Sequence, residues 1–481
     1  MWQLVFMING YFISVLGCAM LIVAGYDMYI SSSSWSHFLN AALFTLFIGM
    51  SLFLSNRTEI KNVSMRQGYL LTTTSWLSIS LLATIPFMLY GGVSDFHDAF
   101  FEAVSGLTGT GATIFKDVEA LPKSILLWRS VLNMTGGIGV VIFAAALLPF
   151  LGIGGMQIFQ RENSDLNDKF MPKFHYIAKR IILVYIFLLV CCIACLYWAG
   201  MGWFDALNHG FSTVATAGFS TKNNSIAFFN SPKVEAVVIV FMLLSALPMT
   251  FFIMLLQNKF RNSLRALQVT TFLKTVLLIV VLMTLWLRFS GVCGDILQAL
   301  RYAAFNVVSI ITTTGFSSTD YLSWGAWAAV AFSLIGLIGG CTGSTTGSIK
   351  IFRWQVVAAF LRQSIELAIT PRRMVLLKIK KFVLGTEVVS SVLVFITLFL
   401  FIAATLTLLL TLNGVDAFTA FAAVMGCITN VGPGVVESIG PNGSFMIFSP
   451  IVKYLLIGAM LLGRLEILTI LVVFTRSFWR N

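Results

Sequence analysis

Long apolar runs separated by short polar segments are the main pattern of the chain. Three of these runs, Trp2–Met28, Tyr69–Gly92 and Ser390–Asn413, each exceed the roughly 20 residues that a helix needs to cross a bilayer. The first run lacks a preceding basic region and is longer than the apolar core of a signal peptide, so we interpret it as a membrane helix. The full pattern predicts ten crossings, at 3–29, 38–55, 69–90, 124–150, 180–200, 233–256, 270–290, 325–350, 385–412 and 446–475.

Composition supports this interpretation. Hydrophobic residues make up 58% of the 481 residues and charged residues only 10%, whereas soluble domains carry about 25% charged residues. The sequence therefore predicts an all-α polytopic membrane protein, with the lipid bilayer as its surroundings.

Basic residues fall on alternate loops between the predicted spans. The basic loops contain Arg57, Lys61 and Arg66; Arg161, Lys169, Lys173, Lys179 and Arg180; Lys259, Arg261, Arg265 and Lys274; and eight residues between Lys350 and Lys381. The opposite loops Ser31–His37 and Asn413–Phe445 contain no Lys or Arg. Because basic loops stay cytoplasmic, we expect both termini in the cytoplasm. Topology explains the net charge of +12, and binding to anionic lipid or nucleic acid is the alternative; we expect no nucleic-acid partner.

Four short segments between the predicted spans share one pattern. They align on Gly111, Gly218, Gly315 and Gly432, at a period of about a hundred residues. Small or hydroxylated residues precede these glycines directly: Thr110, Ala217, Thr314 and Val431. Six positions before the glycines stand Ser105, Ser212, Ser309 and Gly426. One such segment could be an ordinary turn, but four at a near-constant period indicate an internal repeat.

The surroundings of each segment repeat as well. A short helical segment precedes each one and begins near an acidic residue, which is favourable at a helix N-terminus. These acidic residues are Asp98, Asp205, Asp295 and Asp416. The unit is therefore membrane helix, half-helix, pore loop and membrane helix. We predict four fused units around one pore, at 57–165, 166–262, 263–375 and 376–481, after a two-helix extension at 1–56.

Four loops that enter the membrane can form a ring on a common axis. Irregular backbone is tolerated at membrane depth only where protein or water surrounds it. Glycine accepts positive φ angles and so allows successive carbonyl groups to face one axis. A ring of carbonyls can replace the water shell of a cation, and the half-helices direct their negative ends at the same place. The pattern thus indicates an uncharged cation pathway, with ordinary turn glycines as the alternative.

The four segments, with their order and spacing, resemble the superfamily of K⁺ transporters that includes TrkH, TrkG, KtrB and plant HKT proteins. The two leading spans are similar to the TrkH branch. The resemblance implies K⁺ bound by the loop carbonyls, homodimers with one pore per subunit, and K⁺ selectivity, because the four filter glycines favour K⁺ and a serine in the first repeat accompanies Na⁺ transport. Gly109 stands where the family usually has Thr, and we expect it to loosen the first loop.

The second helix of repeat 3 is interrupted by a glycine-rich segment, Gly336–Ser348. Its glycines are Gly336, Gly339, Gly340, Gly343 and Gly347. So many glycines do not make a stable helix, and at this depth the segment should face a cavity. It resembles the intramembrane gating loop of the family. A packing face of small residues is the alternative. We expect no equivalent in the second helices of the other repeats.

Two charges lie deep in the last predicted span. Arg464 and Glu466 are poor partners for each other, because residues two apart on a helix point in nearly opposite directions. Arg464 matches the pore-lining arginine of the family, which implies a positive barrier below the filter; a structural ion pair is the alternative. We expect Glu466 to bind a neighbouring helix.

The stretch Lys350–Lys381 is basic and could dock a cytoplasmic regulator, although a solvated topology signal explains it equally well. The resemblance implies a ring of TrkA-like nucleotide-binding regulatory subunits. The chain has neither a GxGxxG nor a P-loop motif of its own, so we expect no nucleotide bound by this chain.

The sequence therefore predicts a channel-like, low-affinity-type K⁺ uptake subunit of the bacterial inner membrane. A symporter that couples K⁺ to H⁺ or Na⁺ is the alternative, and it would need a titratable site near the path. We expect no enzyme, because no cluster of His, Asp, Glu and Ser residues has catalytic spacing.

Overall fold

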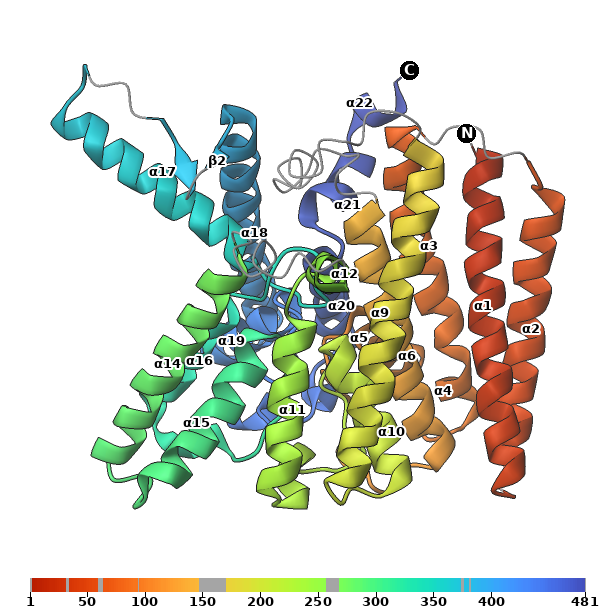
Figure 1. The fold of residues 1–481 in the computed structure, drawn as a ribbon. Helices are drawn as coiled ribbons and strands as arrows, with labels where there is room; N and C mark the ends of the chain where they lie inside the picture. The colour runs from red at the N-terminus through yellow and green to blue at the C-terminus, as the bar shows by residue number, and fades with distance from the viewer. Residues whose placement is uncertain are drawn as a thin grey trace.

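The computed structural model describes residues 2–31, 34–58, 64–93, 95–146, 170–256, 268–372, 376–379 and 382–480. These residues form a bundle of helices with both termini on one side, which we call the termini side (Figure 1). The two-helix extension consists of α1 (Trp2–Tyr29) and α2 (Trp35–Ser55). Repeat 1 contains α3 (Met65–Ala83), α4 (Ile85–Leu89), α5 (Phe96–Thr108) and α6 (Lys123–Ala146).

The other repeats follow the same order. Repeat 2 contains α9 (Phe170–Trp198), α10 (Trp203–Ala215), α11 (Pro232–Ser245) and α12 (Met249–Leu256). Repeat 3 contains α14 (Val269–Phe289), α15 (Ile296–Ile311), α16 (Ala326–Gly336) and α17 (Ile351–Ile369). Repeat 4 contains α18 (Thr386–Leu412), α19 (Ala417–Ile428), α20 (Pro450–Arg464), α21 (Ile467–Val473) and α22 (Arg476–Trp479). Between repeats 3 and 4, the strands β1 (Lys378–Ile379) and β2 (Phe382–Val383) form an antiparallel pair, with Lys378 opposite Val383.

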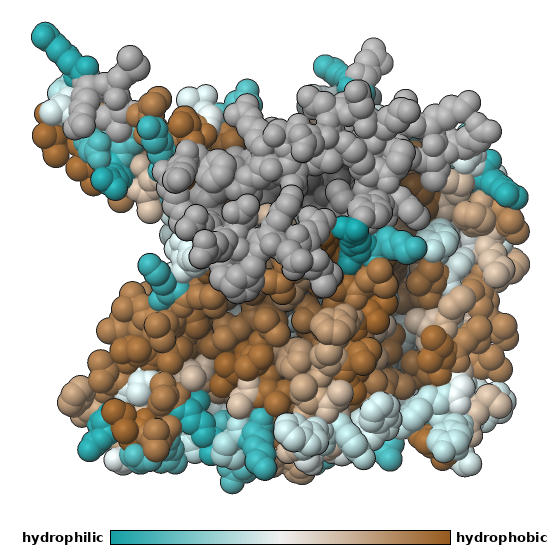
Figure 2. Space-filling view, in the orientation of Figure 1, coloured by the Kyte–Doolittle hydropathy of each residue, from teal (hydrophilic) through white to brown (hydrophobic). Residues whose placement is uncertain are grey.

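The described helices match the apolar pattern. Seven of them are long and apolar enough to cross a membrane, and nine spans result if each of two bent pairs is one crossing. The one remaining expected crossing, 325–350, is helical over Ala326–Gly336 and then continues without helix to α17. Figure 2 shows a broad hydrophobic band above a hydrophilic rim on the side opposite the termini. The chain is therefore a multi-pass helical membrane protein.

The division into four units remains a prediction in its details. The boundaries at 165 and 262 lie outside the described residues, as do several basic residues that define the predicted topology, such as Arg161 and Arg261. The half-helices α5, α10, α15 and α19 each precede one of the four aligned glycines. The described residues thus contain the elements of each unit in the predicted order.

The expectation that only repeat 3 has an interrupted second helix is wrong. In repeat 2, α11 and α12 meet at 91° across residues 246–248, where Pro248 cannot donate a backbone hydrogen bond. In repeat 4, α20 and α21 meet at 111°, and Glu466 between them has a positive φ of 63°. Neither break is glycine-rich, since one lies at a proline and the other at charged residues, so a search for runs of glycine does not reveal them.

Helices α1 and α2 pack through glycines with no room for a side chain. A Cβ built on Gly10 of α1 would lie 2.5 Å from the Phe53 backbone nitrogen and 2.7 Å from the Gly49 carbonyl oxygen. Backbones can approach this closely because glycine has no side chain, and small residues at helix contacts are typical of membrane proteins.

We predict that Gly10→Leu separates the two helices and lowers the free energy of unfolding in detergent by about 1–3 kcal/mol, because overpacking displaces neighbouring backbone. Gly25→Leu on the same helix is the control, since a Cβ there meets nothing within 4 Å. Thermal or denaturant unfolding measures both variants, and equal stability of the two would contradict the packing argument.

Candidate functional site

The four aligned glycines lie in one closed ring, although the chain brings them from four separate segments. All have positive φ angles, 79° at Gly111, 83° at Gly218, 79° at Gly315 and 94° at Gly432. A Cβ on each would come within 3.0 Å of a carbonyl oxygen of the next repeat, in the order Ala217, Thr314, Val431 and Thr110. The fourth repeat therefore contacts the first, and the ring leaves no space for a side chain at any of the four positions.

The backbone before each glycine has the same conformation in all four repeats. The residue two positions earlier is left-handed: Gly109, Thr216, Thr313 and Asn430 have φ angles of 63°, 51°, 56° and 56°. Gly109 therefore adopts the conformation of its counterparts, and a glycine does so with little strain.

The residue directly before each glycine donates its backbone N–H to the half-helix. The Thr110 N–H donates to the Ser105 carbonyl over 2.9 Å, and the bonds from Ala217, Thr314 and Val431 measure 2.9, 2.8 and 3.0 Å. Because these N–H groups point back to the half-helix, the loops do not direct them at the middle of the ring.

The residue six positions before the ring glycine acts differently from repeat to repeat, either through a hydroxyl group or through the absence of a side chain. In repeats 1 and 3, the Ser105 and Ser309 hydroxyls donate to the Ala112 and Phe316 carbonyls, over 2.5 and 2.6 Å. In repeat 4 this residue is Gly426, and a Cβ there would lie 2.7 Å from the Gly432 carbonyl oxygen. Close approach of the loop explains why the repeat pattern has a glycine at this position.

The predicted gating segment lies against the ring on the termini side. Residues 337–350 connect α16 to α17 without helix (Figure 1). Most of these residues are buried. The Gly347 N–H donates to the Thr313 hydroxyl over 2.8 Å, and the Thr345 and Thr216 hydroxyls lie 3.2 Å apart. A Cβ on Gly347 would lie 2.6 Å from the Thr429 carbonyl oxygen. The segment thus contacts the half-helix ends of repeats 2, 3 and 4.

The same segment is held by the break in repeat 2. The Cys341 N–H donates to the Ala246 carbonyl over 2.9 Å, and the Met249 N–H donates to the Gly343 carbonyl over 3.0 Å. Each break thus provides backbone partners for the other. Among the predicted gating glycines, Gly339 and Gly343 have positive φ angles, whereas Gly336 ends α16.

Arg464 lies near the half-helix end of repeat 1, the repeat that the contacts of the gating segment described above do not include. Its Nη2 would lie 3.2 Å from a Cβ on Gly109, so the guanidinium group faces the first repeat. The side chain is buried, and its three nitrogens have no hydrogen-bond partner among the described residues. A buried cation without a partner is costly and marks a functional site in membrane proteins.

Glu466 pairs with Arg353, as expected of a bond to a neighbouring helix. The Arg353 Nη2 donates to Glu466 Oε2, and this ion pair joins the break of repeat 4 to the first turn of α17. Arg353 and Lys350 are 2% and 6% exposed. These two residues therefore cannot belong to an exposed docking face, and the basic stretch available on the surface is smaller than the sequence suggests.

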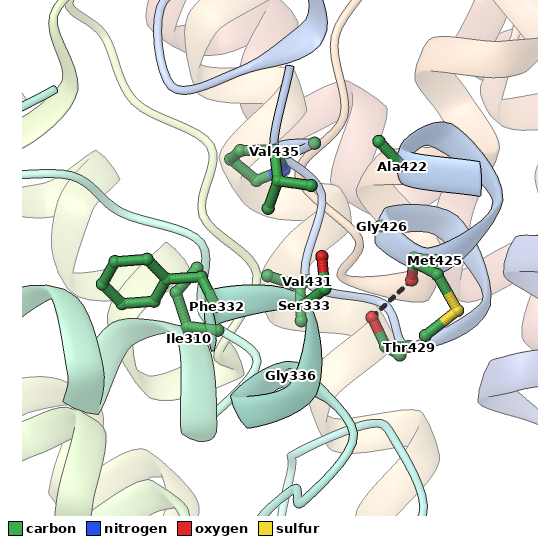
Figure 3. Close-up of a pocket in the computed structure, with 12 residues that line it drawn as sticks. Ile310, Phe332, Ser333, Gly336, Ala422, Met425, Gly426, Thr429, Val431 and Val435 are labelled. Atoms are coloured by element: carbon green, nitrogen blue, oxygen red, sulfur yellow. Dashed lines mark hydrogen bonds between the residues drawn. The ribbon is translucent and has the colours of Figure 1, made fainter. Parts of the chain in front are cut away.

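A small, mostly apolar pocket lies beside the ring, between α15 and α16 on one side and α19 on the other (Figure 3). Its hydroxyls have partners, since Thr429 donates to the Met425 carbonyl over 2.6 Å and Ser333 to the Ala329 carbonyl over 2.9 Å. The pocket lies behind Val431 and offers no arrangement of ligands for a cation.

The loops that follow Gly111 and Gly218 are joined at the surface. The Asn223 Nδ2 donates to Asp117 Oδ1 over 2.9 Å, and the Val118 N–H donates to Asn223 Oδ1 over 2.7 Å. The hydrogen bond from Asn223 holds the pKa of the Asp117 carboxyl below its usual range.

Sequence reasoning found the ring glycines and Arg464, but it missed the residues that connect them to the gating segment. Thr216, Thr313 and Asn430 each stand two positions before a ring glycine, so they lie within the four aligned segments. Nothing in the sequence shows that another segment contacts them. Their role depends on a contact between distant parts of the chain.

The four loops thus meet in one ring among helices that are long and apolar enough to cross a membrane. Comparison with known proteins specifies the family. The sequence profile of TrkH, described as a cation transport protein, matches residues 34–480. The chain belongs to the TrkH family, a family of transporters and not of enzymes.

Individual relatives agree with this assignment. The Trk system potassium uptake protein TrkI of Halomonas elongata is 38% identical over 86% of this chain and 84% of its own length. The Trk system potassium uptake protein TrkH of Escherichia coli K12 is 34% identical over 91% of this chain and 90% of its own length. The crystal structure of the potassium transporter TrkH from Vibrio parahaemolyticus superposes with a TM-score of 0.93, at 30% identity and with complete coverage of both chains.

Proposed function

We propose that the chain is a channel-like K⁺ uptake subunit of the bacterial inner membrane, with both termini in the cytoplasm. The closed ring is the observation that carries this proposal. The carbonyl groups of Thr110, Ala217, Thr314 and Val431, with those of the glycines that follow, hold K⁺ in place of its water shell. The names of the relatives support K⁺ as the transported ion.

The gate is formed by the segment Gly336–Ser348 together with Arg464. Their contacts cover all four left-handed residues at the base of the ring, three by the segment and Gly109 by Arg464. Because α17 begins directly after the segment and is paired to Glu466, a pull on α17 moves the segment. A TrkA-like nucleotide-binding ring in the cytoplasm supplies this pull, and the chain works as a homodimer with one pore per subunit.

Coupled symport of K⁺ with H⁺ or Na⁺ is the second candidate. Asp27 of α1 favours it, because it is a buried carboxylate within an apolar helix. However, Asp27 belongs to the two-helix extension and not to a half-helix or pore loop, which favours uncoupled permeation. Uptake of K⁺ into liposomes without H⁺ or Na⁺ gradients distinguishes the two candidates.

We predict that K⁺ and Rb⁺ permeate while Na⁺ and Li⁺ permeate poorly, as measured by reversal potentials under bi-ionic conditions. Gly111→Ser should lower the K⁺/Na⁺ permeability ratio about tenfold, because a Cβ strains the positive φ and displaces the Ala217 carbonyl. Gly414→Ser is the matched control, since Gly414 has a φ of 84° but nothing within 4 Å. Equal permeability of K⁺ and Na⁺ in the wild-type protein would refute the proposal.

We predict that Arg464→Ala increases K⁺ flux into proteoliposomes, because a fixed charge in a low-dielectric cavity can raise the energy of a cation by several kcal/mol. Arg464→Lys retains the charge and should leave flux low. Arg288→Ala, which removes an exposed arginine at the end of α14, controls for the loss of a positive charge. Unchanged flux in a well-expressed Arg464→Ala protein would show that Arg464 is structural.

We predict that deletion within Gly339–Thr346 raises flux and makes it independent of the regulator. Gly347→Ala should act in the same direction with less disturbance, since its Cβ would press on the Thr429 carbonyl and displace the segment. Isotope uptake into vesicles, with and without the regulator, measures both effects. If the variants fold, retain K⁺ preference and stay regulated, the segment is only a packing face.

A further inference from the structure

Three of the four pore loops are supported from behind by a polar side chain, and each of the three is of a different kind. The supporting position lies nine residues before the ring glycine and contains Glu102, His209, Asn306 and Ala423. The His209 Nε2 lies 2.8 Å from the Ser220 hydroxyl, and the Asn306 Nδ2 donates to the Ser318 hydroxyl over 3.2 Å. Ala423 has no polar group for such a bond. The ring is therefore close to fourfold in its backbone but unequal in the side chains that hold it.

Repeat 1 has the only charged member of this set. Glu102 is fully buried, and it accepts hydrogen bonds from the Thr113 hydroxyl over 3.1 Å and from the Ile114 N–H over 3.0 Å. Both donors follow Gly111 closely in the loop. Arg129 of α6, which is 2% exposed, donates from Nε to Glu102 Oε1 over 2.7 Å.

Arg129 also reaches the next repeat. Its Nη2 donates to the Thr113 hydroxyl over 3.2 Å, and its Nη1 donates to the Ser220 carbonyl over 3.0 Å. Thr113 and Ser220 each stand two residues after a ring glycine. The guanidinium carbon lies 4.0 Å from the ring centroid of Phe219, which directly follows Gly218. One side chain thus fixes equivalent positions of two pore loops relative to each other.

A planar guanidinium group is suited to this arrangement, because its donors have fixed directions. Buried charged hydrogen bonds are also among the stronger ones, so the two loops resist displacement. Discrimination between K⁺ and Na⁺ depends on the positions and number of the carbonyl groups that replace water. The charges of Glu102 and Arg129 cancel, so the pair contributes rigidity without a net charge behind the ring.

We propose that Glu102 and Arg129 are positioning residues that set cation selectivity by clamping the pore loops of repeats 1 and 2. The proposal rests on the proposed function, in which these loops form the selectivity filter. Neither side chain contacts the ion. The clamp acts through the Thr113 hydroxyl and the Ser220 carbonyl.

The test measures ²²Na⁺ and ⁸⁶Rb⁺ uptake and bi-ionic reversal potentials with full-length protein in proteoliposomes. Arg129→Gln should lower the K⁺/Na⁺ permeability ratio about tenfold while K⁺ flux persists. The K⁺/Na⁺ permeability ratio of Arg129→Lys should lie between those of the wild-type protein and Arg129→Gln, because one ammonium group cannot replace three directed donors. Thr113→Val, which removes the shared hydroxyl with little change in shape, should shift the ratio in the same direction by a smaller factor.

Arg301→Gln is the matched control. Arg301 of α15 pairs with Glu235 of α11 through two hydrogen bonds of 2.7 Å and joins repeats 2 and 3. Among the described residues, no hydrogen bond or ion pair joins Arg301 to a pore loop. It should lower thermal stability without changing the ratio. An unchanged ratio in folded Arg129→Gln, or an equal change in Arg301→Gln, would overturn the proposal. If Arg129→Gln does not fold, an unchanged ratio in Thr113→Val overturns it.

These outcomes differ from failure of the proposed function. A wild-type protein that passes Na⁺ and K⁺ equally, or passes neither, refutes the selective pore itself. A selective wild-type protein with a selective Arg129→Gln variant refutes only the clamp.

Discussion

The close approach of each ring glycine to a carbonyl group of the next repeat is the constraint on which the rest of the structure depends. No residue with a Cβ fits at Gly111, Gly218, Gly315 or Gly432, because the neighbouring backbone already occupies that space. The four loops must therefore arrive at one axis with nearly identical backbone. The half-helices and the spans around them supply the rigid elements that make this arrival possible.

The two sides of the ring are organised differently. On the termini side, polar backbone without helix lies in the membrane interior, where each unpaired group is costly. The breaks of repeats 2 and 3 solve this problem together, since Ala246 and Gly343 accept hydrogen bonds from each other's segments. Arg464 has no such solution, since its three guanidinium nitrogens have no hydrogen-bond partner among the described residues.

On the opposite side, ion pairs with buried carboxylates join the repeats. Glu235 with Arg301 links repeats 2 and 3, and Asp98 with Lys453 links repeats 1 and 4. The pair of Glu102 and Arg129 contacts the loops that follow two of the ring glycines, at Thr113 and at Ser220. Buried pairs add little net stability over apolar packing, but removal of one partner leaves an uncompensated charge. Their effect is to fix how neighbouring repeats sit relative to each other.

The sequence by itself determined the membrane spans, the repeat and the four glycines, because each is a local pattern: an apolar run, a period, or a residue without a side chain. It also marked Gly336–Ser348 and Arg464 as exceptions within apolar helices. Only the tertiary structure decided which residues meet. The contact of Gly347 with Thr313, the pairing of Arg353 with Glu466, and the reach of Arg129 to Ser220 join positions far apart in the chain, and no local pattern encodes such distances. The bends at Pro248 and Glu466 likewise depend on partners from other segments, because a broken helix in a membrane persists only where neighbours satisfy its backbone.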